Sequence, residues 1–343
     1  MNYYTSLTPL KDFPILLRKA QLIFKDGKRL RIREGVSQNG QWGDVQPFAV
    51  LDDETYPMPS GIEVEWISII ESKRFCVNAP LDSEHIESLW LQHMVNGLED
   101  EPPRSIYKYI AVGIAPCGGL AVWLHGRKKQ TLVAWLQANA DPMNAEEQSS
   151  LLNGIPLEKF CDHIISEMQF PRIEPFSYEN IMRQYAYRFV VELKQWNEER
   201  KAWVDYAPDE PKKPKLAYLE VHRIDGTYDR LHDGTLQEFQ KTGRPRNISV
   251  CWNVGKTEYS AYFFLDEKQT ELAFSKLNML NLDGQFDVLL QVDPLAEKYM
   301  VSIRAQDIIC PEVLTDIEVL AFRNRFECFR SKNYSQSEGA WQW

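Results

Sequence analysis

A chain of 343 residues, 44% apolar and 26% charged, has the composition of a folded globular protein with room for two ordinary domains. No stretch approaches the roughly 18 uninterrupted apolar residues of a membrane helix, and a net charge of −10 argues against binding to a phosphate backbone. The composition therefore disfavours a disordered chain, a membrane-spanning chain and a nucleic-acid-binding protein.

The start of the chain and its cysteines bear on the compartment. Residues 1–11 carry neither the basic nor the apolar segment of a signal peptide. We therefore expect a cytoplasmic protein, or a periplasmic one if a leader has been removed. The six cysteines are scattered without a C-x-x-C pair, which argues against a zinc ribbon and favours buried thiols.

The first half of the chain contains signals of both strands and helices. Asp26-Gly27 lies between apolar-rich runs and predicts a hairpin with a type I′ turn. A strand alternates apolar and polar residues from Ile62 to Trp66, and Asp82 is placed to cap an amphipathic helix. An apolar strand then runs from Tyr109 to Pro116.

Further elements are expected around and beyond the middle of the chain. An apolar stripe predicts a helix over residues 157–168, and prolines place a domain boundary near residue 180. The alternation from Tyr185 to Tyr206 predicts a hairpin with the polar run Asn197 to Lys201 as its turn. A last helix is predicted over Val313 to Phe329.

Four landmarks of the first half recur in the second half in the same order. They return as the turn Asp225-Gly226, the strand Ile248 to Trp252, the helix cap Asp266 and the proline-ended strand Asp287 to Pro294. The spacing between matched landmarks only shrinks, as loop shortening in the second copy would give. We predict an α+β fold, a tandem duplication of a mostly antiparallel β-sheet unit packed with one or two helices, with domains at 1–180 and 181–343.

Acidic charge is concentrated in one part of the chain. Residues 51–100 hold 11 acidic and 2 basic residues, whereas residues 1–50 hold 4 and 8. A charge run is usually a solvated face, but a patch of one sign also steers basic partners and speeds their association. The exposed candidates for binding a partner are Asp52, Asp53, Glu54, Glu99, Asp100 and Glu101.

The sequence contains none of the common motifs of catalytic or phosphate-binding sites, such as G-x-S-x-G, G-x-G-x-x-G or H-E-x-x-H. Cys161 with His163 and Glu167 is the best metal candidate, yet Cys161 falls on the apolar stripe of a predicted helix and is more simply a buried thiol. We therefore expect no enzyme activity, no cofactor and no metal. Catalysis through His125 or Cys161 is the remaining alternative.

The run Tyr109 to Gly126, followed by Leu132 to Gln137, resembles a bacterial family catalogued as domain of unknown function 2931. The runs Pro59 to Ile70 and Met182 to Phe189 are similar to it as well. The second half fits only as a degenerate copy, with Ser302 near the place of Trp123. We expect the first copy to carry recognition and the second to support it.

The resemblance implies a function. Members of this family are often lipoproteins, and many look like they are encoded beside type VI secretion effectors, notably phospholipases, where immunity proteins are expected. It therefore implies an immunity protein that binds and occludes a cognate antibacterial toxin, of the type VI or polymorphic class and most simply a lipase-class effector. The family's pattern fixes no catalytic residues. The alternative is an envelope lipoprotein or structural binding module without a toxin partner.

Overall fold

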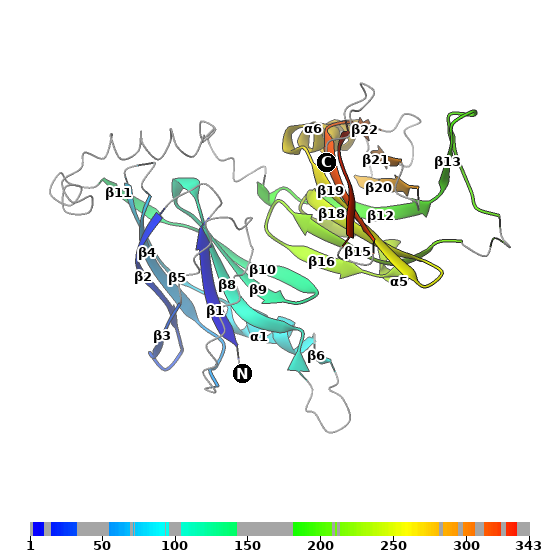
Figure 1. Cartoon of the computed structure of the whole chain (residues 1–343). Coiled ribbons are helices and arrows are strands. Elements are labelled where there is room, and N and C mark those ends of the chain that lie inside the picture. The colour runs from blue at the N-terminus through cyan, green and yellow to red at the C-terminus, as the bar shows by residue number, and fades with distance from the viewer. Residues whose placement is uncertain are drawn as a thin grey trace. The chain divides into compact units, whose positions relative to one another are not determined.

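The computed structural model describes residues 3–9, 15–32, 55–68, 71, 73–92, 94–95, 104–142, 181–207, 210, 213–280, 284–293, 298–305, 312–323 and 327–334. The chain divides into two compact units, Met1–Tyr178 (unit 1) and Glu179–Trp343 (unit 2). Figure 1 draws the described parts of unit 1 in blue to cyan and those of unit 2 in green to red. In their described residues both units are mostly antiparallel β-sheet with few helices, which agrees with the α+β class.

Unit 1 contains two main layers of strands. One is an antiparallel sheet in the order β11-β5-β4-β2-β3, made of β2 (Ile15–Ile23), β3 (Arg29–Arg31), β4 (Gly61–Ser68), β5 (Lys73–Pro80) and β11 (Asn139–Pro142). The other has the order β1-β8-β9-β10, made of β1 (Tyr4–Pro9), β8 (Tyr107–Ala115), β9 (Gly119–Gly126) and β10 (Lys129–Gln137). In this layer β1 runs parallel to β8, and the other neighbours are antiparallel.

The described residues of unit 1 also form shorter elements. They are helix α1 (Ser83–Gln92), the single turn η1 (Pro116–Gly118) and the small pair β6 (Met94–Val95) and β7 (Arg104–Ser105). The predicted Asp82 cap is confirmed, since the backbone N–H of His85 donates to Asp82 Oδ1 over 2.9 Å. The helix predicted over residues 157–168 lies outside the described residues.

Alternation from Ile62 to Trp66 in β4 shows which face of this sheet covers the core. Ile62, Val64 and Trp66 are buried, whereas Glu63 and Glu65 between them lie on the opposite face. The buried side chains of β4 share one core with those of β8 and β9, and α1 adds Ile86 and Trp90. The core therefore lies between the two layers.

Unit 2 also has two layers of strands. One has the order β16-β15-β18-β19-β23-β24, made of β15 (Lys215–Arg223), β16 (Tyr228–Leu231), β18 (Pro245–Val254), β19 (Thr257–Leu265), β23 (Ile317–Arg323) and β24 (Glu327–Tyr334). The other has the order β17-β12-β20-β21-β22, made of β12 (Tyr185–Leu193), β17 (Gln240–Thr242), β20 (Gln285–Val292), β21 (Tyr299–Ala305) and β22 (Glu312–Leu314). Helices α5 (Asp233–Leu236) and α6 (Glu267–Leu280) accompany them.

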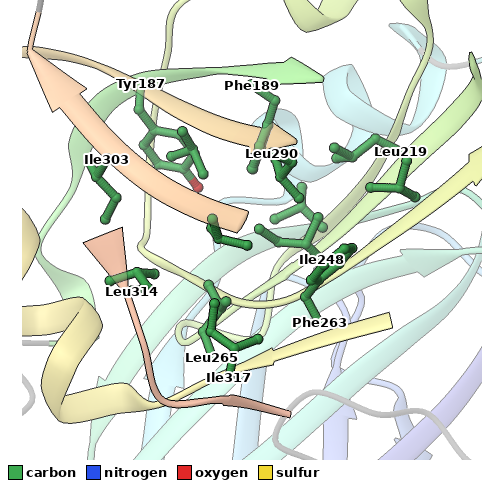
Figure 2. Close-up of a cluster of buried hydrophobic side chains, with 14 of the residues drawn as sticks. Tyr187, Phe189, Leu219, Ile248, Phe263, Leu265, Leu290, Ile303, Leu314 and Ile317 are labelled. Carbon is green, nitrogen blue, oxygen red and sulfur yellow. The ribbon is translucent and has the colours of Figure 1, made fainter. Parts of the chain in front are cut away.

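The core of unit 2 fills the space between its layers. Figure 2 shows side chains from both layers pointing toward one another, among them Phe189, Leu290, Ile248 and Phe263. Helix α6 contributes Ala273, Phe274 and Leu277 to the same core. The helix begins at a capped end, where the N–H of Gln269 donates to Asp266 Oδ1 over 2.7 Å.

The strands of the two units follow one another in a matching order. The order β3-β2-β4-β5-β11 of unit 1 has its counterpart in β16-β15-β18-β19-β23 of unit 2, and β1-β8-β9-β10 has its counterpart in β12-β20-β21-β22. The parallel pair also recurs, since β12 runs parallel to β20. A register shift falls between Leu17 and Lys19 in β2 and between Leu216 and Tyr218 in β15, each time beside the tryptophan of the next strand.

Both Asp-Gly hairpins are present, but their turns are not of type I′. Gly27 and Gly226 have φ of 81° and 80°, whereas the preceding aspartates do not have positive φ. In the first hairpin Phe24 N–H donates to the Lys28 carbonyl oxygen over 3.0 Å, which makes a three-residue loop closed by the glycine. The prediction of a hairpin is therefore confirmed, and the predicted turn type is wrong.

The helix predicted over Val313 to Phe329 is also wrong. This segment forms β22, β23 and β24. Ile317, Val319 and Ala321 are buried in alternation, and β23 pairs with the edge of β19. Leu314, Ile317 and Leu320 also fit helical spacing and concealed this period of two, because both patterns fit a short apolar run.

The hairpin predicted from Tyr185 to Tyr206 is smaller than expected. Strand β12 pairs with β17 and β20, and only β13 (Gln195–Asn197) and β14 (Ala202–Val204) pair with each other. This hairpin precedes the first matched landmark, so the shrinking spacing between landmarks does not extend to it. The connection over residues 194–214 is longer than its counterpart over residues 10–14.

Candidate interaction surfaces

The six acidic residues predicted to bind a partner lie outside the described residues. They are Asp52, Asp53, Glu54, Glu99, Asp100 and Glu101. Glu63, from the same acidic part of the chain, is described, and its contacts show how its charge is compensated in the folded protein.

Glu63 lies on the outer face of unit 1 within a cluster of basic side chains. Its carboxylate accepts from Lys19 Nζ over 2.5 Å, from Arg29 Nη1 over 2.7 Å and from the Gln21 amide. The hydrogen bond from Lys19, outweighing partial burial, lowers the pKa of Glu63. Basic side chains of β2 and β3 therefore form ion pairs with Glu63 of β4, and part of the charge contrast along the sequence cancels in space.

The corresponding face of unit 2 is richer in aromatic side chains, which lie there together with the ion pair of Glu220 and Arg230. We define the aromatic face as the side chains on this side of the sheet, which are Tyr218, His222, Tyr228, Tyr262, Phe264 and Phe322, with Tyr228 buried among them. Tyr262 is 40% exposed and packs edge-on against Phe322, with ring centroids 5.5 Å apart. His222 stacks on Tyr228 at 5.1 Å. The fold requires neither set of residues, because the same strand order carries both.

A cation–π contact and an ion pair lie within this face, because Glu220 falls between Tyr218 and His222 on the same side of β15. The Arg230 guanidinium lies 4.5 Å from the centre of the Tyr218 ring and pairs with Glu220 on the neighbouring strand. Burial raises the pKa of Tyr218 to about 12. These groups are therefore held in position and remain partly exposed to solvent.

Unit 2 also buries a charged group. Arg223 is 1% exposed, and its Nε donates to the Tyr187 hydroxyl over 3.1 Å, while its Nη1 donates to Asp229 Oδ2 over 2.7 Å. Tyr187 in turn donates to the carbonyl oxygen of Gly243 over 2.7 Å. Burial raises the pKa of Tyr187 to about 12, so this phenol remains a donor over the physiological pH range.

Unit 1 makes the tyrosine contact without the arginine. Tyr3 donates to the carbonyl oxygen of Pro57 over 2.8 Å, just as Tyr187 does to Gly243. Phe24, which precedes the Asp-Gly turn as Arg223 does, stacks on Tyr56 at 5.9 Å. The sequence did not reveal this relationship, because arginine is normally assigned to the surface by residue type.

The hairpin formed by β13 and β14 is a further candidate surface. We name residues Gln195–Val204 the tryptophan arm. Trp196 and Trp203 are paired across its strands, with ring centroids 5.4 Å apart. In Figure 1 the hairpin at β13 stands beyond the end of β12, apart from the sheets of unit 2.

His125, one of the two candidates for catalysis, is half-buried on β9. Its Nδ1 is hydrogen-bonded to Gln130 Oε1 over 2.5 Å, and its ring meets Tyr109 edge-on at 5.6 Å. These contacts join neighbouring strands. The other candidate, Cys161, lies outside the described residues together with His163 and Glu167.

The glycine pair after β8 serves a tight turn. Gly118 has φ of 83°, and a Cβ there would lie 2.8 Å from Phe75. In the described part of the chain, no group of three histidine, cysteine, aspartate or glutamate residues is placed to hold a metal ion. Within those same residues, no helix has the length and apolar character needed to cross a membrane.

Comparison with known families gives one match, to the family described as "Protein of unknown function (DUF2931)", over residues 2–171. The part of the chain at residues 2–171 belongs to this family. The DUF2931 match spans β1 to β11, and thus all the described strands of unit 1. Unit 2 lies beyond the matched residues. The comparisons with curated proteins and with solved structures found no match.

Proposed function

We propose that this DUF2931 protein is an immunity protein, which binds a cognate antibacterial toxin and neutralises it by occlusion. The toxin is of the type VI secretion or polymorphic class, and a lipase-class effector is the first candidate. Under this proposal the residues act by shape and charge complementarity and not by catalysis. The compartment follows that of the toxin, the cytoplasm or the periplasm.

The observation that carries the proposal is the aromatic face of unit 2. Aromatic residues are enriched at the centres of protein interfaces, where they bury much area for little lost side-chain freedom. Tyr262 and Phe322 present such area on an outward sheet face. In unit 1 the positions equivalent to Tyr218 and Tyr228 hold Lys19 and Arg29, which pair with Glu63. The larger aromatic area therefore favours unit 2, in place of the first copy expected from the sequence, for apolar contact with a partner.

The acidic residues have a different role in this proposal. Asp52, Asp53, Glu54, Glu99, Asp100 and Glu101 would attract a basic surface of the toxin. Long-range attraction of this kind raises the association rate more than it slows dissociation. The acidic residues would thus guide the encounter, while apolar area would hold the complex.

We also propose that the two units arose by tandem duplication. Support comes from the matching strand orders, the recurring parallel pair and the register shifts beside Trp66 and Trp252. The tyrosine hydroxyl bonds of Tyr3 and Tyr187 add a contact that a shared strand order does not require. Duplication provides a second copy that is free to acquire new surfaces.

A binding experiment with the purified product of the adjacent gene tests the function. Tyr262→Glu should weaken binding about tenfold or more, because it places a charge on the apolar contact area. Leu91→Glu, at a side chain that is 52% exposed on α1, is the matched control and should change affinity less than twofold. If the unchanged protein, Tyr262→Glu and Leu91→Glu all bound the partner with equal affinity, the aromatic face would have no role in binding.

The alternative is an envelope lipoprotein or structural binding module without a toxin partner. Growth of a deletion strain beside toxin-bearing siblings separates the two. The immunity proposal expects the deletion strain to be killed and the plasmid-borne gene to rescue it. Unaltered survival of the deletion strain would overturn the immunity proposal.

A further inference from the structure

The tryptophan arm is an addition that the fold does not need. In unit 1 the strands β1 and β2 are joined by residues 10–14, whereas in unit 2 the equivalent strands β12 and β15 are joined by residues 194–214. The longer connection folds into its own two-stranded sheet. Because both units keep the same strand order, the arm has to be explained by something other than the closure of the core.

The arm is held in a defined shape. A lone two-stranded hairpin is only marginally stable in water, so the arm depends on side-chain contacts. The Trp196–Trp203 pair joins its strands, and the N–H of Arg200 donates to Asn197 Oδ1 over 2.8 Å within the turn. Glu198 pairs with Lys201 over 2.8 Å across the same turn.

Contacts with β20 and β21 fix the arm to unit 2. The backbone N–H of Trp196 donates to Asp293 Oδ2 over 3.2 Å, and Asp293 directly follows β20. Lys298, just before β21, lies 5.2 Å from the centre of the Trp196 ring and 2.9 Å from Glu198. The arm is thus ordered before any partner arrives, which lowers the entropy lost on binding.

The exposed parts of the arm suit a protein surface. Glu199 and Arg200 are exposed side by side at the tip and carry opposite charges. Trp196 and Trp203 are half-exposed along the strands, and tryptophan and arginine are the residues most enriched at binding hot spots. A tip with both signs of charge matches neither a nucleic acid nor an anionic membrane.

We propose that the tryptophan arm is an insertion element that enters a concave surface of a protein partner and blocks it. The inference rests on the proposed function and deepens it, since the partner is the toxin and the concave surface is the one that the toxin needs for its activity. A two-stranded ribbon is narrow, with strands about 4.8 Å apart, and therefore fits a cleft better than a flat interface.

Replacing Gln195–Val204 by Gly-Gly tests the inference, because the retained Lys194 and Asp205 flank the two ends of the hairpin. Affinity for the purified product of the adjacent gene should fall about 100-fold or more. The midpoint of thermal unfolding should change little, because unit 1 forms the matching strand order without an arm. Unchanged affinity and unchanged inhibition of the partner would overturn the role of the arm.

A charge exchange at the tip provides the second variant. The double substitution Glu199→Lys, Arg200→Glu keeps the hairpin and should weaken binding about tenfold. Lys256→Glu, in the exposed turn between β18 and β19, is the matched control and should bind as the unchanged protein does. An effect of Lys256→Glu equal to that of the tip exchange would overturn a specific role for the tip.

The outcomes separate the arm from the proposed function. An arm-deleted protein that still binds but no longer inhibits the partner would support blocking by insertion. An unchanged protein that neither binds nor inhibits the partner would overturn the proposed function and the arm's role together. Arm-dependent self-association in gel filtration, or arm-dependent binding to phosphatidylglycerol vesicles, would overturn the arm's role by assigning it another occupant.

Discussion

Arg223 Nη1 and Asp229 Oδ2 form an ion pair of 2.7 Å in which the arginine is almost completely withdrawn from water. Breaking one side of such a pair leaves the other charge without compensation, and costs about 3 kcal/mol or more. Phe24 takes the equivalent place in unit 1, so the fold itself tolerates an apolar residue there.

We therefore expect Arg223→Ala to destabilise unit 2 by about 3 kcal/mol, and Arg223→Phe combined with Asp229→Asn to destabilise it by less than half as much. Urea unfolding followed by a probe in unit 2 measures both. Arg230→Ala removes a partly exposed pair and should cost less than about 1 kcal/mol. If the double variant were no more stable than Arg223→Ala, the unpaired buried charge would not be the cause of the loss.

The two tyrosine hydroxyl bonds lead to a paired prediction. Tyr3→Phe leaves the Pro57 carbonyl without its donor and should cost about 1 kcal/mol. Tyr187→Phe should cost more, about 2 kcal/mol, because it removes the acceptor of Arg223 Nε as well as the donor to Gly243. Denaturant unfolding gives both values, and a larger loss for Tyr3→Phe would be contrary evidence.

Gly243 is expected to be intolerant of a side chain. A Cβ there would lie 2.7 Å from the carboxylate of Asp225, which is held by Thr227. Gly243→Ala should therefore destabilise unit 2 by about 2 kcal/mol. In a double-mutant cycle, adding Asp225→Gly should remove most of this effect. Additive losses would show that the clash with Asp225 is not the cause.

A control for this glycine lies in the same unit. Gly255 has φ of 62°, and a Cβ added there would meet no other atom within 4 Å. Gly255→Ala should therefore cost only about 1 kcal/mol, from the backbone conformation alone. Thermal unfolding of the two variants side by side separates a steric effect from a conformational one.

Glu198 gives a prediction about pH. Hydrogen bonds from Lys201 and then from Lys298 lower the pKa of Glu198 from 4.5 to about 2. A carboxyl whose pKa is depressed stabilises the folded arm above pH 4.5, and this contribution is lost as the pH falls toward 2. NMR titration of the Glu198 side chain should therefore give a midpoint near 2 in the unchanged protein.

Lys298→Met should move that midpoint upward, because it removes one of the two lysine partners and leaves the turn intact. Lys276→Met, at an exposed pair with Glu312 on other elements, is the control and should leave the midpoint in place. A midpoint near 4.5 in the unchanged protein would mean that the arm is not attached through Glu198 in solution.

The acidic candidates lead to a kinetic prediction. Reversing Asp52, Asp53 and Glu54 to lysine should slow association with the toxin about tenfold at low salt and leave dissociation nearly unchanged. The difference should shrink as salt is raised, because screening shortens the reach of charge. Stopped-flow binding at several salt concentrations measures both effects, and an unchanged salt dependence would exclude steering by these residues.

Local signals predicted the fold best. The Asp-Gly turns, the tryptophan strands and the Asp82 and Asp266 caps were all recognisable, because a few adjacent residues determine each of them. The segment from Val313 to Phe329 was misassigned because a short apolar run satisfies both periods. Part of this run forms strand β23 because it pairs with the edge of β19, a contact that lies far away in the sequence.

Pairings between distant residues were out of reach of sequence reasoning. Nothing local to β1 indicates that it runs beside β8, or that Tyr3 bonds to Pro57. The aromatic face was equally hidden, since His222 and Tyr262 become neighbours of other rings only through strand register. Candidate surfaces of this protein therefore had to come from the folded arrangement.

The parallel pairing of β1 with β8 has a consequence for biosynthesis. Tyr4 lies opposite Tyr109, so β1 leaves the ribosome about a hundred residues before its partner strand β8. Until then β1 exposes unsatisfied backbone groups, which are open to aggregation or to a chaperone. Unit 2 repeats this delay with β12 and β20, so each unit completes its fold only late in its own synthesis.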